Sequence, residues 1–303
     1  MDGPQTLRDV ILHFADEQIA FEYIRDLRWP GEPACPQCSS GRHSFLSTRK
    51  TWKCKACGHQ FSVRSGTIFE GSPLPLGKWI TAVWLLVNSK NGVSSHELGR
   101  SIGVTQKTAW HMLQRIRLAM QNGTIEKLAG TVEVDETYVG GKFKFMHYAR
   151  KKKFQGRGTV GKAIVMGFRQ RGGIVRCKVI PNITKGTLCR LVRENVEPGA
   201  TVYSDALSSY DHVDPAYEHR TVDHSRRQYT DGTVSTNGIE NFWCLLKRAI
   251  KGTYAWVSHK HLHRYVEEAT FRYNHRKMND LERFVTLLGQ AAGRQLTYRE
   301  LIT

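Results

Sequence analysis

Apolar residues recur at two different spacings along this chain of 303 residues. In the first 120 residues they return every three or four positions, which predicts helices at 7–29, 79–88 and 94–120. After residue 130 they alternate with polar residues or form short runs, which is typical of strands. The pattern therefore predicts a helical first part and a second part of the α/β class.

The second part is expected to fold as a mixed sheet with helices. The predicted elements are strands at 131–138, 162–169 and 173–180, a helix at 187–195, strands at 201–205 and 218–222, and helices at 235–250 and 259–276. Residues 171–173, Arg-Gly-Gly, are a hairpin signal between the second and third strands. In the first strand Val132 and Val134 would be buried, which turns Asp135 to the opposite face.

Residues 94–120 carry the pattern of a helix-turn-helix. Ser94 and Glu97 have the spacing of a capping box that opens one helix. Gly103 fits the tight turn, and Thr105 can cap a second helix. The polar residues that the second helix would turn outward, into the major groove of DNA, are Gln106, Lys107, Thr108, His111 and Arg115. Many helical proteins contain two helices around a glycine without binding DNA, so that alternative stays open.

Lysine and arginine are concentrated in residues 142–162, which contain eight of them and no acidic residue. Aromatic residues lie between them, so the segment can grip a phosphate backbone and stack on an exposed base. The residues expected to contact phosphates are Lys151, Lys152, Lys153 and Arg157. The alternative is a flexible, solvated basic loop.

The whole chain is basic, with 45 lysines and arginines against 27 aspartates and glutamates and a net charge of +18. Such a charge favours a polyanionic partner, most simply a nucleic acid such as double-stranded DNA, although a ribosome-like scaffold or an anionic membrane surface would fit the charge alone. The longest apolar run, Trp79–Val87, has nine residues, whereas about 20 are needed to span a bilayer. Residues 1–5 do not resemble a secretory signal. The expected location is the cytoplasm, in association with the nucleoid, and not a membrane.

Four of the seven cysteines form the pattern C-x₂-C-x₁₅-C-x₂-C. Cys35, Cys38, Cys54 and Cys57 can supply four thiolates to one tetrahedral, structural Zn²⁺. The turn-rich sequence around them predicts a zinc ribbon. A pair of disulfides is the alternative, which a reducing compartment disfavours.

Three acidic residues lie in segments that can present carboxylates at one edge of the sheet. They are Asp135 in the first strand, Asp205 at the end of the fourth, and Glu240 in the next helix. Lys247 shares a helix face with Glu240, because seven residues return close to the starting azimuth. Mg²⁺ prefers carboxylate oxygens, and two Mg²⁺ ions roughly 3.5–4 Å apart can activate an attacking oxygen and stabilise a leaving one. The acids therefore predict a two-metal site that cuts phosphodiesters, with Lys247 near a phosphate.

Ordinary structural explanations exist for the same residues. Asp205 can cap the helix that follows it. Glu240 and Lys247 can form a solvated helix face.

The motifs around these residues resemble one family. They are Val-Glu-Val-Asp-Glu-Thr-Tyr-Val-Gly-Gly at 132–141, Tyr-Ser-Asp-Ala at 203–206, Thr-Asn-Gly-Ile-Glu-Asn-Phe-Trp at 236–243, Leu-Lys-Arg at 246–248 and Phe-Arg-Tyr-Asn-His-Arg at 271–276. Together with the four cysteines they resemble the zinc-ribbon, ISXO-type bacterial insertion-sequence DDE transposases over nearly the whole chain.

The resemblance implies a ribonuclease H-like catalytic core with Asp135, Asp205 and Glu240 as its acidic triad and Lys247 as the associated lysine. It also implies Mg²⁺-dependent cleavage at element ends, with Mn²⁺ able to substitute, and joining of the freed 3′-hydroxyl to target DNA. Pairing of two element ends makes a homo-oligomer the expected form on DNA.

Relatives vary at the third acidic position, where some have asparagine, so Asn237 is an alternative to Glu240. The seven-residue step to Lys247 favours Glu240. Many relatives have a histidine where this chain has Ser235, and His224 is the candidate for a similar donor.

The predicted organisation follows from these segments. It is a helical lead-in at 1–32, a zinc ribbon at 33–70, a helix-turn-helix at 76–122, a ribonuclease H-like catalytic domain at 130–258 and a helical segment at 259–303. A DNA transposase is the favoured function. The alternatives are a DNA-binding regulator with a catalytically silent core and a nuclease that cuts without joining.

Overall fold

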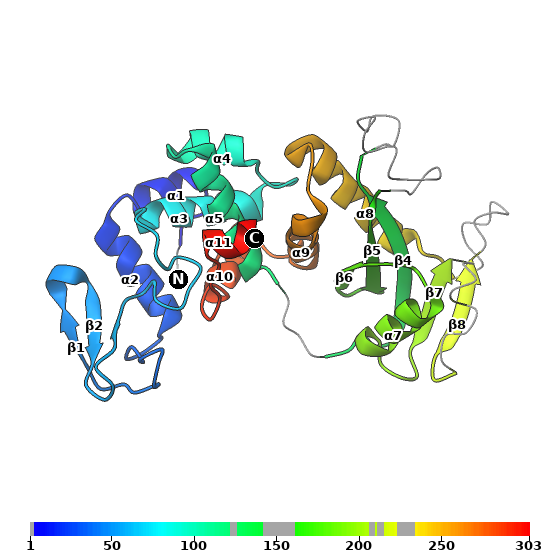
Figure 1. Ribbon diagram of the computed structural model, residues 1–303, viewed down its shortest axis with the longest axis horizontal. Coiled ribbons are helices and arrows are strands. Elements are labelled where there is room, and N and C mark those ends of the chain that lie inside the picture. Colours follow the sequence, from blue (N-terminus) through cyan, green and yellow to red (C-terminus); the bar gives the residue numbers. More distant parts are fainter. Residues whose placement is uncertain (1–2, 122–125, 142–160, 206–209, 211–214, 223–233) are drawn as a thin grey trace. The chain divides into compact units, whose positions relative to one another are not determined.

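The computed structural model describes residues 3–121, 126–141, 161–205, 210, 215–222 and 234–303. The chain forms two compact units (Figure 1). The first contains Met1–Gln121 and Lys277–Thr303, and the second contains Asn122–Arg276. The sequence predicts a single segment at 259–303, whereas the structure divides it between the two units.

Helix α3 (Leu76–Asn88) is the centre of the first unit, because most of its side chains are buried. The helices packed against it are α1 (Leu7–His13), α2 (Glu17–Arg28), α4 (Ser95–Ile102), α5 (Gln106–Ala119) and α10 (Asp280–Gly289). The C-terminal residues also join this unit through the backbone, since the Gly293 N–H donates to the Gly66 carbonyl at 2.7 Å. The short helix α11 (Tyr298–Ile302) follows.

The first unit also contains a small antiparallel sheet in the order β1-β2-β3, in which Cys54 is the last residue of β2. Its strands are β1 (His43–Leu46), β2 (Thr51–Cys54) and β3 (Gln60–Phe61), with a 3₁₀ turn η1 (Ser47–Arg49) between the first two. Trp52 is buried between Phe21 of α2 and Phe61 of β3, with ring centroids 5.7 and 5.8 Å away. This aromatic stack fixes the sheet on α2.

Helices α4 and α5 begin where their capping residues predict. The Ser94 hydroxyl accepts a hydrogen bond from the Glu97 N–H, and the Thr105 hydroxyl accepts one from the Thr108 N–H. Gly103 ends α4 with φ 63°, in the left-handed region that favours glycine. The two helices therefore form a tight pair joined at Gly103.

The second unit contains a five-stranded mixed sheet in the order β6-β5-β4-β7-β8 (Figure 1). The strands are β4 (Thr131–Val139), β5 (Ala163–Gln170), β6 (Val175–Ile180), β7 (Thr201–Asp205) and β8 (Glu218–Val222). The first three are antiparallel neighbours, whereas β7 runs parallel to β4 and β8 runs parallel to β7. The predicted mixed sheet and its hairpin at residues 171–173 are confirmed.

Helices cover both faces of this sheet. Helix α7 (Lys185–Asn195) packs on one face with Val132, Val134 and Phe168. Helices α8 (Asn237–Ala249) and α9 (Leu262–Asn274) contribute to a separate core on the other, which includes Val165. Alternate residues of β4 and β5 belong to the two cores, as the strand period requires.

Candidate functional site

Asp135 and Asp205 lie on the adjacent parallel strands β4 and β7. The last residues that pair between these strands are Glu133 and Tyr203, and each acid lies two positions further along its strand. Because side chains alternate between the faces of a sheet, the two acids lie at the same level and on the same face.

Trp243 of α8 holds the side chain of Asp135. Its indole N–H donates to Oδ2 of Asp135 at 2.8 Å, which places this acid on the α8 face, opposite Val134. The predicted orientation of Asp135 is therefore confirmed. Gly167 pairs with Asp135 across the sheet, and a Cβ there would lie 2.6 Å from the Trp243 ring. Only glycine at 167 leaves room for the indole against the sheet.

The surroundings of Asp135 oppose its ionisation. Burial, together with the negative charges of Glu136 and Glu240, raises the pKa of Asp135 to about 7, although the bond from Trp243 acts in the other direction. The carboxylates of Asp135 and Glu240 are therefore close enough for their charges to interact. A bound divalent cation would remove this repulsion and favour the ionised form.

Glu240 lies half-buried in the first turn of α8, where its Oε1 accepts a hydrogen bond from the Thr236 hydroxyl at 2.9 Å. Asn237 is exposed at the first position of the same helix, and Lys247 is exposed two turns beyond Glu240. Of the two candidates for the third ligand, Glu240 is the one whose charge acts on Asp135.

Glu133 is a further acid whose importance the sequence pattern does not reveal. It is 2% exposed, and its Oε2 accepts the Ile239 N–H at 2.9 Å, so a strand side chain caps α8. Its Oε1 pairs with Arg169 at 2.9 Å and with Arg171 at 3.1 Å. These contacts anchor the helix that carries Glu240. The sequence feature that could have revealed Glu133 is its position as an acidic residue between two valines of a predicted strand, Val132 and Val134.

Glu136 is the second acid that the pattern does not single out. Tyr210, which is fully buried, donates its hydroxyl hydrogen to Oε2 of Glu136 at 2.9 Å. Burial raises the pKa of Glu136, the Tyr210 bond opposes the shift, and the charge of Asp205 adds to it. The sequence feature that could have revealed Glu136 is its position directly after Asp135, which makes an acidic pair.

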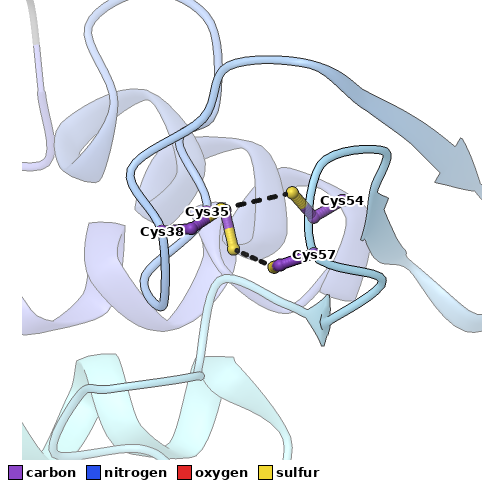
Figure 2. A group of neighbouring side chains, drawn as sticks. All are labelled: Cys35, Cys38, Cys54 and Cys57. Atoms are coloured by element: carbon purple, nitrogen blue, oxygen red, sulfur yellow. Dashed lines mark hydrogen bonds between the residues drawn. The ribbon is translucent and has the colours of Figure 1, made fainter.

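The four cysteines form a metal-ligand group in the first unit. Their sulfur atoms lie within 4.8 Å of one another, and Figure 2 shows the side chains converging from two loops. The Sγ atoms of Cys35 and Cys57 are 3.7 Å apart, and those of Cys38 and Cys54 are 3.5 Å apart. A tetrahedron with Zn–S bonds of about 2.3 Å has edges of about 3.8 Å. The cysteines are free thiols, and their arrangement fits one structural zinc ion.

Among the described residues, these four cysteines are the one cluster in which three or more potential metal ligands (His, Cys, Asp or Glu) lie this close together. The three predicted acids do not form a group as compact as this. Their oxygen donors are nevertheless the type that Mg²⁺ prefers, and the mutual charge repulsion at Asp135 is what a cation would relieve.

The predicted reading helix, α5, is only partly available to a ligand. Gln106 and Lys107 are exposed, whereas Thr108 is half-buried. His111 is half-buried, with a ring nitrogen 3.3 Å from the Leu296 carbonyl. The Lys107 ammonium lies 4.7 Å from the centroid of the Tyr298 ring.

Arg115 corrects the prediction that this helix turns all five polar residues outward. Its side chain is 6% exposed and donates a hydrogen bond to the Glu70 carbonyl, so the expectation that Arg115 faces outward is wrong. Its guanidinium also lies over the Trp79 ring. The cause is long-range packing, because the segment before α3 covers this face of α5.

Several predicted residues lie outside the described part of the chain. They are Lys151, Lys152, Lys153, Arg157 and His224. In the described ranges, none of the helices combines the length and apolar character needed to cross a membrane.

Two family models match this chain. The model of the ISXO2-like transposase domain matches residues 127–274, which include β4 to α9, and the model of the transposase zinc-ribbon domain matches residues 15–60. The two matches coincide with the sheet that carries the acids and with the cysteine cluster.

Two relatives carry related descriptions. A Halobacterium salinarum protein described as an uncharacterized protein in transposable element ISH50 is 28% identical over 249 residues, covering 78% of this chain and 83% of that protein. An uncharacterized transposase-like protein of Haemophilus influenzae is 32% identical over 105 residues, covering 33% of this chain and 84% of that protein. The chain therefore belongs to the family of ISXO2-like transposases that carry a zinc ribbon.

Proposed function

We propose that the protein cleaves DNA at the ends of its insertion sequence and joins the freed 3′-hydroxyl to target DNA. The proposal rests on one observation: Asp135 and Asp205 lie at the same level and on the same face of adjacent parallel strands, and the charge of Glu240 acts on Asp135. The order β6-β5-β4-β7-β8, with helices on both faces, supports a ribonuclease H-like core.

In this proposal Asp135, Asp205 and Glu240 hold two Mg²⁺ ions, or Mn²⁺ in their place. The ions would activate the attacking oxygen and stabilise the leaving one. Trp243 fixes the carboxylate of Asp135 through its indole N–H. Lys247, exposed on the same helix as Glu240, contacts a phosphate of the strand.

DNA binding is assigned to both units. Gln106 and Lys107 are the exposed residues of α5 that would reach base edges, with Thr108 beside them. Segment 142–162 would contact phosphates through its lysines and arginines. The zinc ion would hold the ribbon folded without taking part in cleavage, because four thiolates leave no open position. The protein would act in the cytoplasm at the nucleoid, as a homo-oligomer on paired ends.

The test is incubation of the purified protein with DNA that carries its own flanking sequences. Nicks at the element ends and products joined to a second DNA are expected with added Mg²⁺ and not in its absence. Nicks without joined products would indicate a nuclease. Binding of the ends without nicks, by a protein with a full zinc content, would indicate a regulator and refute the proposal.

A further inference from the structure

Trp256 is displayed to solvent at the end of the helix that carries Glu240. Helix α8 continues into one π-helical turn, η5 (Ile250–Tyr254), and Trp256 follows two residues later. The side chain is 66% exposed, the largest fraction for a large apolar residue in the described parts of the chain. Tryptophan is enriched at binding surfaces compared with the rest of a protein's surface.

The backbone before Trp256 is in a strained conformation. Ala255 has φ 56° and ψ −51°, and the Trp256 N–H donates to the Tyr254 carbonyl at 2.5 Å. This is the rare, strained form of the γ-turn, at a residue that is not glycine. Strain of this kind persists where the surrounding structure imposes it, and it is concentrated at functional sites.

The residues on both sides of the turn are fixed in the core of the second unit. The Tyr254 hydroxyl donates to the buried Glu268, and its ring lies edge-on to Tyr265 with the centroids 4.8 Å apart. Val257 is buried in the core that α8 and α9 share. The turn therefore presents Trp256 rigidly, so that little side-chain and loop entropy remains to be lost on binding.

The surface around Trp256 is positively charged. Residues 241–266 contain five lysines and arginines, three histidines and no acid. Lys247 shares the azimuth of Glu240, Lys251 follows one turn later, and both are exposed. At a rise of about 1.5 Å per residue, this line runs for roughly 20 Å from Glu240 to the turn. The two lysines lie between Glu240 and Trp256 along this helix and its turn.

We propose that Trp256 stacks on an unpaired base of a DNA strand whose phosphates are held by Lys247 and Lys251. The inference rests on the proposed function, because it assigns to that strand a path along α8 away from the acids. Base stacking on an aromatic ring tolerates any sequence, since every base has a flat face. Trp256 is thus a positioning residue that keeps the strand in register with the cleavage site.

The test is DNA binding by the full-length, zinc-loaded protein in buffer without added Mg²⁺ or chelator, so that no cleavage occurs. The probes are a blunt duplex and the same duplex with an overhang of unpaired thymidines. Trp256→Ala is expected to lower affinity for the overhang probe by about 5- to 150-fold, the range of one lost stacking contact. Affinity for the blunt duplex should change less than about twofold.

Three matched variants separate stacking from other effects. Trp256→Phe should restore most of the affinity, because it keeps an aromatic face. Leu245→Ala, which removes another exposed apolar side chain on α8, should bind both probes like wild type. Ala255→Gly should bind both probes like wild type, because glycine adopts this positive φ without strain and the indole is retained. In salt titrations, Trp256→Ala should keep the wild-type slope, whereas Lys251→Ala should flatten it by about 0.7–0.9.

Equal binding of the overhang probe by wild type and Trp256→Ala would overturn the inference. So would a loss of self-association in Trp256→Ala with DNA affinity unchanged, because the ring would then contact a second copy of the chain. These binding results are independent of cleavage. A wild-type protein that binds as expected but never cuts would refute the proposed function and leave the stacking contact standing.

Discussion

Neutralising the buried Glu133 should destabilise the second unit and leave the first unit unchanged. In Glu133→Gln the amide keeps the size of the side chain and can still accept the Ile239 N–H. It cannot form the charged pairs with Arg169 and Arg171. The arginines would then lie beside a neutral group at the point where α8 meets the sheet.

The expected loss can be worked out from the contacts. Breaking a buried ion pair by removing one partner costs about 3–5 kcal/mol. Here the cost is lower, because the side chains of Arg169 and Arg171 are 18% and 31% exposed. Both also keep other acceptors, the Tyr273 hydroxyl at 3.1 Å and the Ser235 carbonyl at 3.1 Å. We expect a loss of about 2–3 kcal/mol in the free energy of unfolding of this unit.

Urea denaturation followed by circular dichroism and by tryptophan fluorescence measures this effect. With a slope of about 2 kcal/mol per M, the midpoint of the second unit should fall by about 1–1.5 M. Glu218→Gln is the matched control, because it makes the same change on the same sheet at an acid whose side chain is 54% exposed. It should change the free energy of unfolding by less than about 0.5 kcal/mol.

A midpoint for Glu133→Gln that matches wild type would refute this account of the α8 anchor. An equal shift of both units would also contradict it, since Glu133 contacts only the second unit in the described residues. Restoration of wild-type stability by Glu133→Asp is not expected, because the shorter side chain cannot reach Ile239 and both arginines together.

Three further predictions follow from the site residues. Arg115→Ala should lower the stability of the first unit by about 1–3 kcal/mol, which thermal unfolding measures. Lys107→Ala should leave stability unchanged and weaken binding of cognate ends only, which gel-shift assays on cognate and scrambled ends measure. Because the pKa of Asp135 is raised to about 7, protons compete with Mg²⁺ for this carboxylate below that pH. The Mg²⁺ concentration for half-maximal cleavage should therefore rise up to about tenfold from pH 7 to pH 6 and change little from pH 9 to pH 8. An equal change in both intervals would contradict the assignment of Asp135 as a metal ligand. Metal analysis is expected to find one zinc per chain in the wild type and a loss of that zinc in Cys54→Ser, and full zinc retention by the variant would refute the four-thiolate site.

Local patterns predict the elements of this fold well. The strand expected at 201–205 is β7, and the strand expected at 218–222 is β8. The first is a short run of β-branched and aromatic residues, a local signal that does not depend on how the elements pack. The cysteine pattern is local in the same sense, because each loop supplies two ligands three residues apart.

Long-range contacts account for what the sequence does not reveal. Arg115 occupies a position that helical periodicity turns outward, but the chain around Glu70 returns to cover it. The capping of α8 by Glu133 joins residues that are 106 positions apart. The C-terminal segment likewise returns to the first unit, which no period within the segment indicates. These features require knowledge of how the elements pack.

Cleavage of element-end DNA in Mg²⁺ under single-turnover conditions tests the central claim most directly, with Glu240→Gln compared against Asn237→Ala. The two residues are one turn apart on α8; Glu240 is a carboxylate whose charge acts on Asp135, whereas Asn237 is uncharged. Loss of a metal ligand removes several kcal/mol of transition-state stabilisation, so Glu240→Gln should cut at least about a hundredfold more slowly while still binding the ends. Asn237→Ala should stay within about tenfold of wild type. An inactive Asn237→Ala beside an active Glu240→Gln would contradict the account.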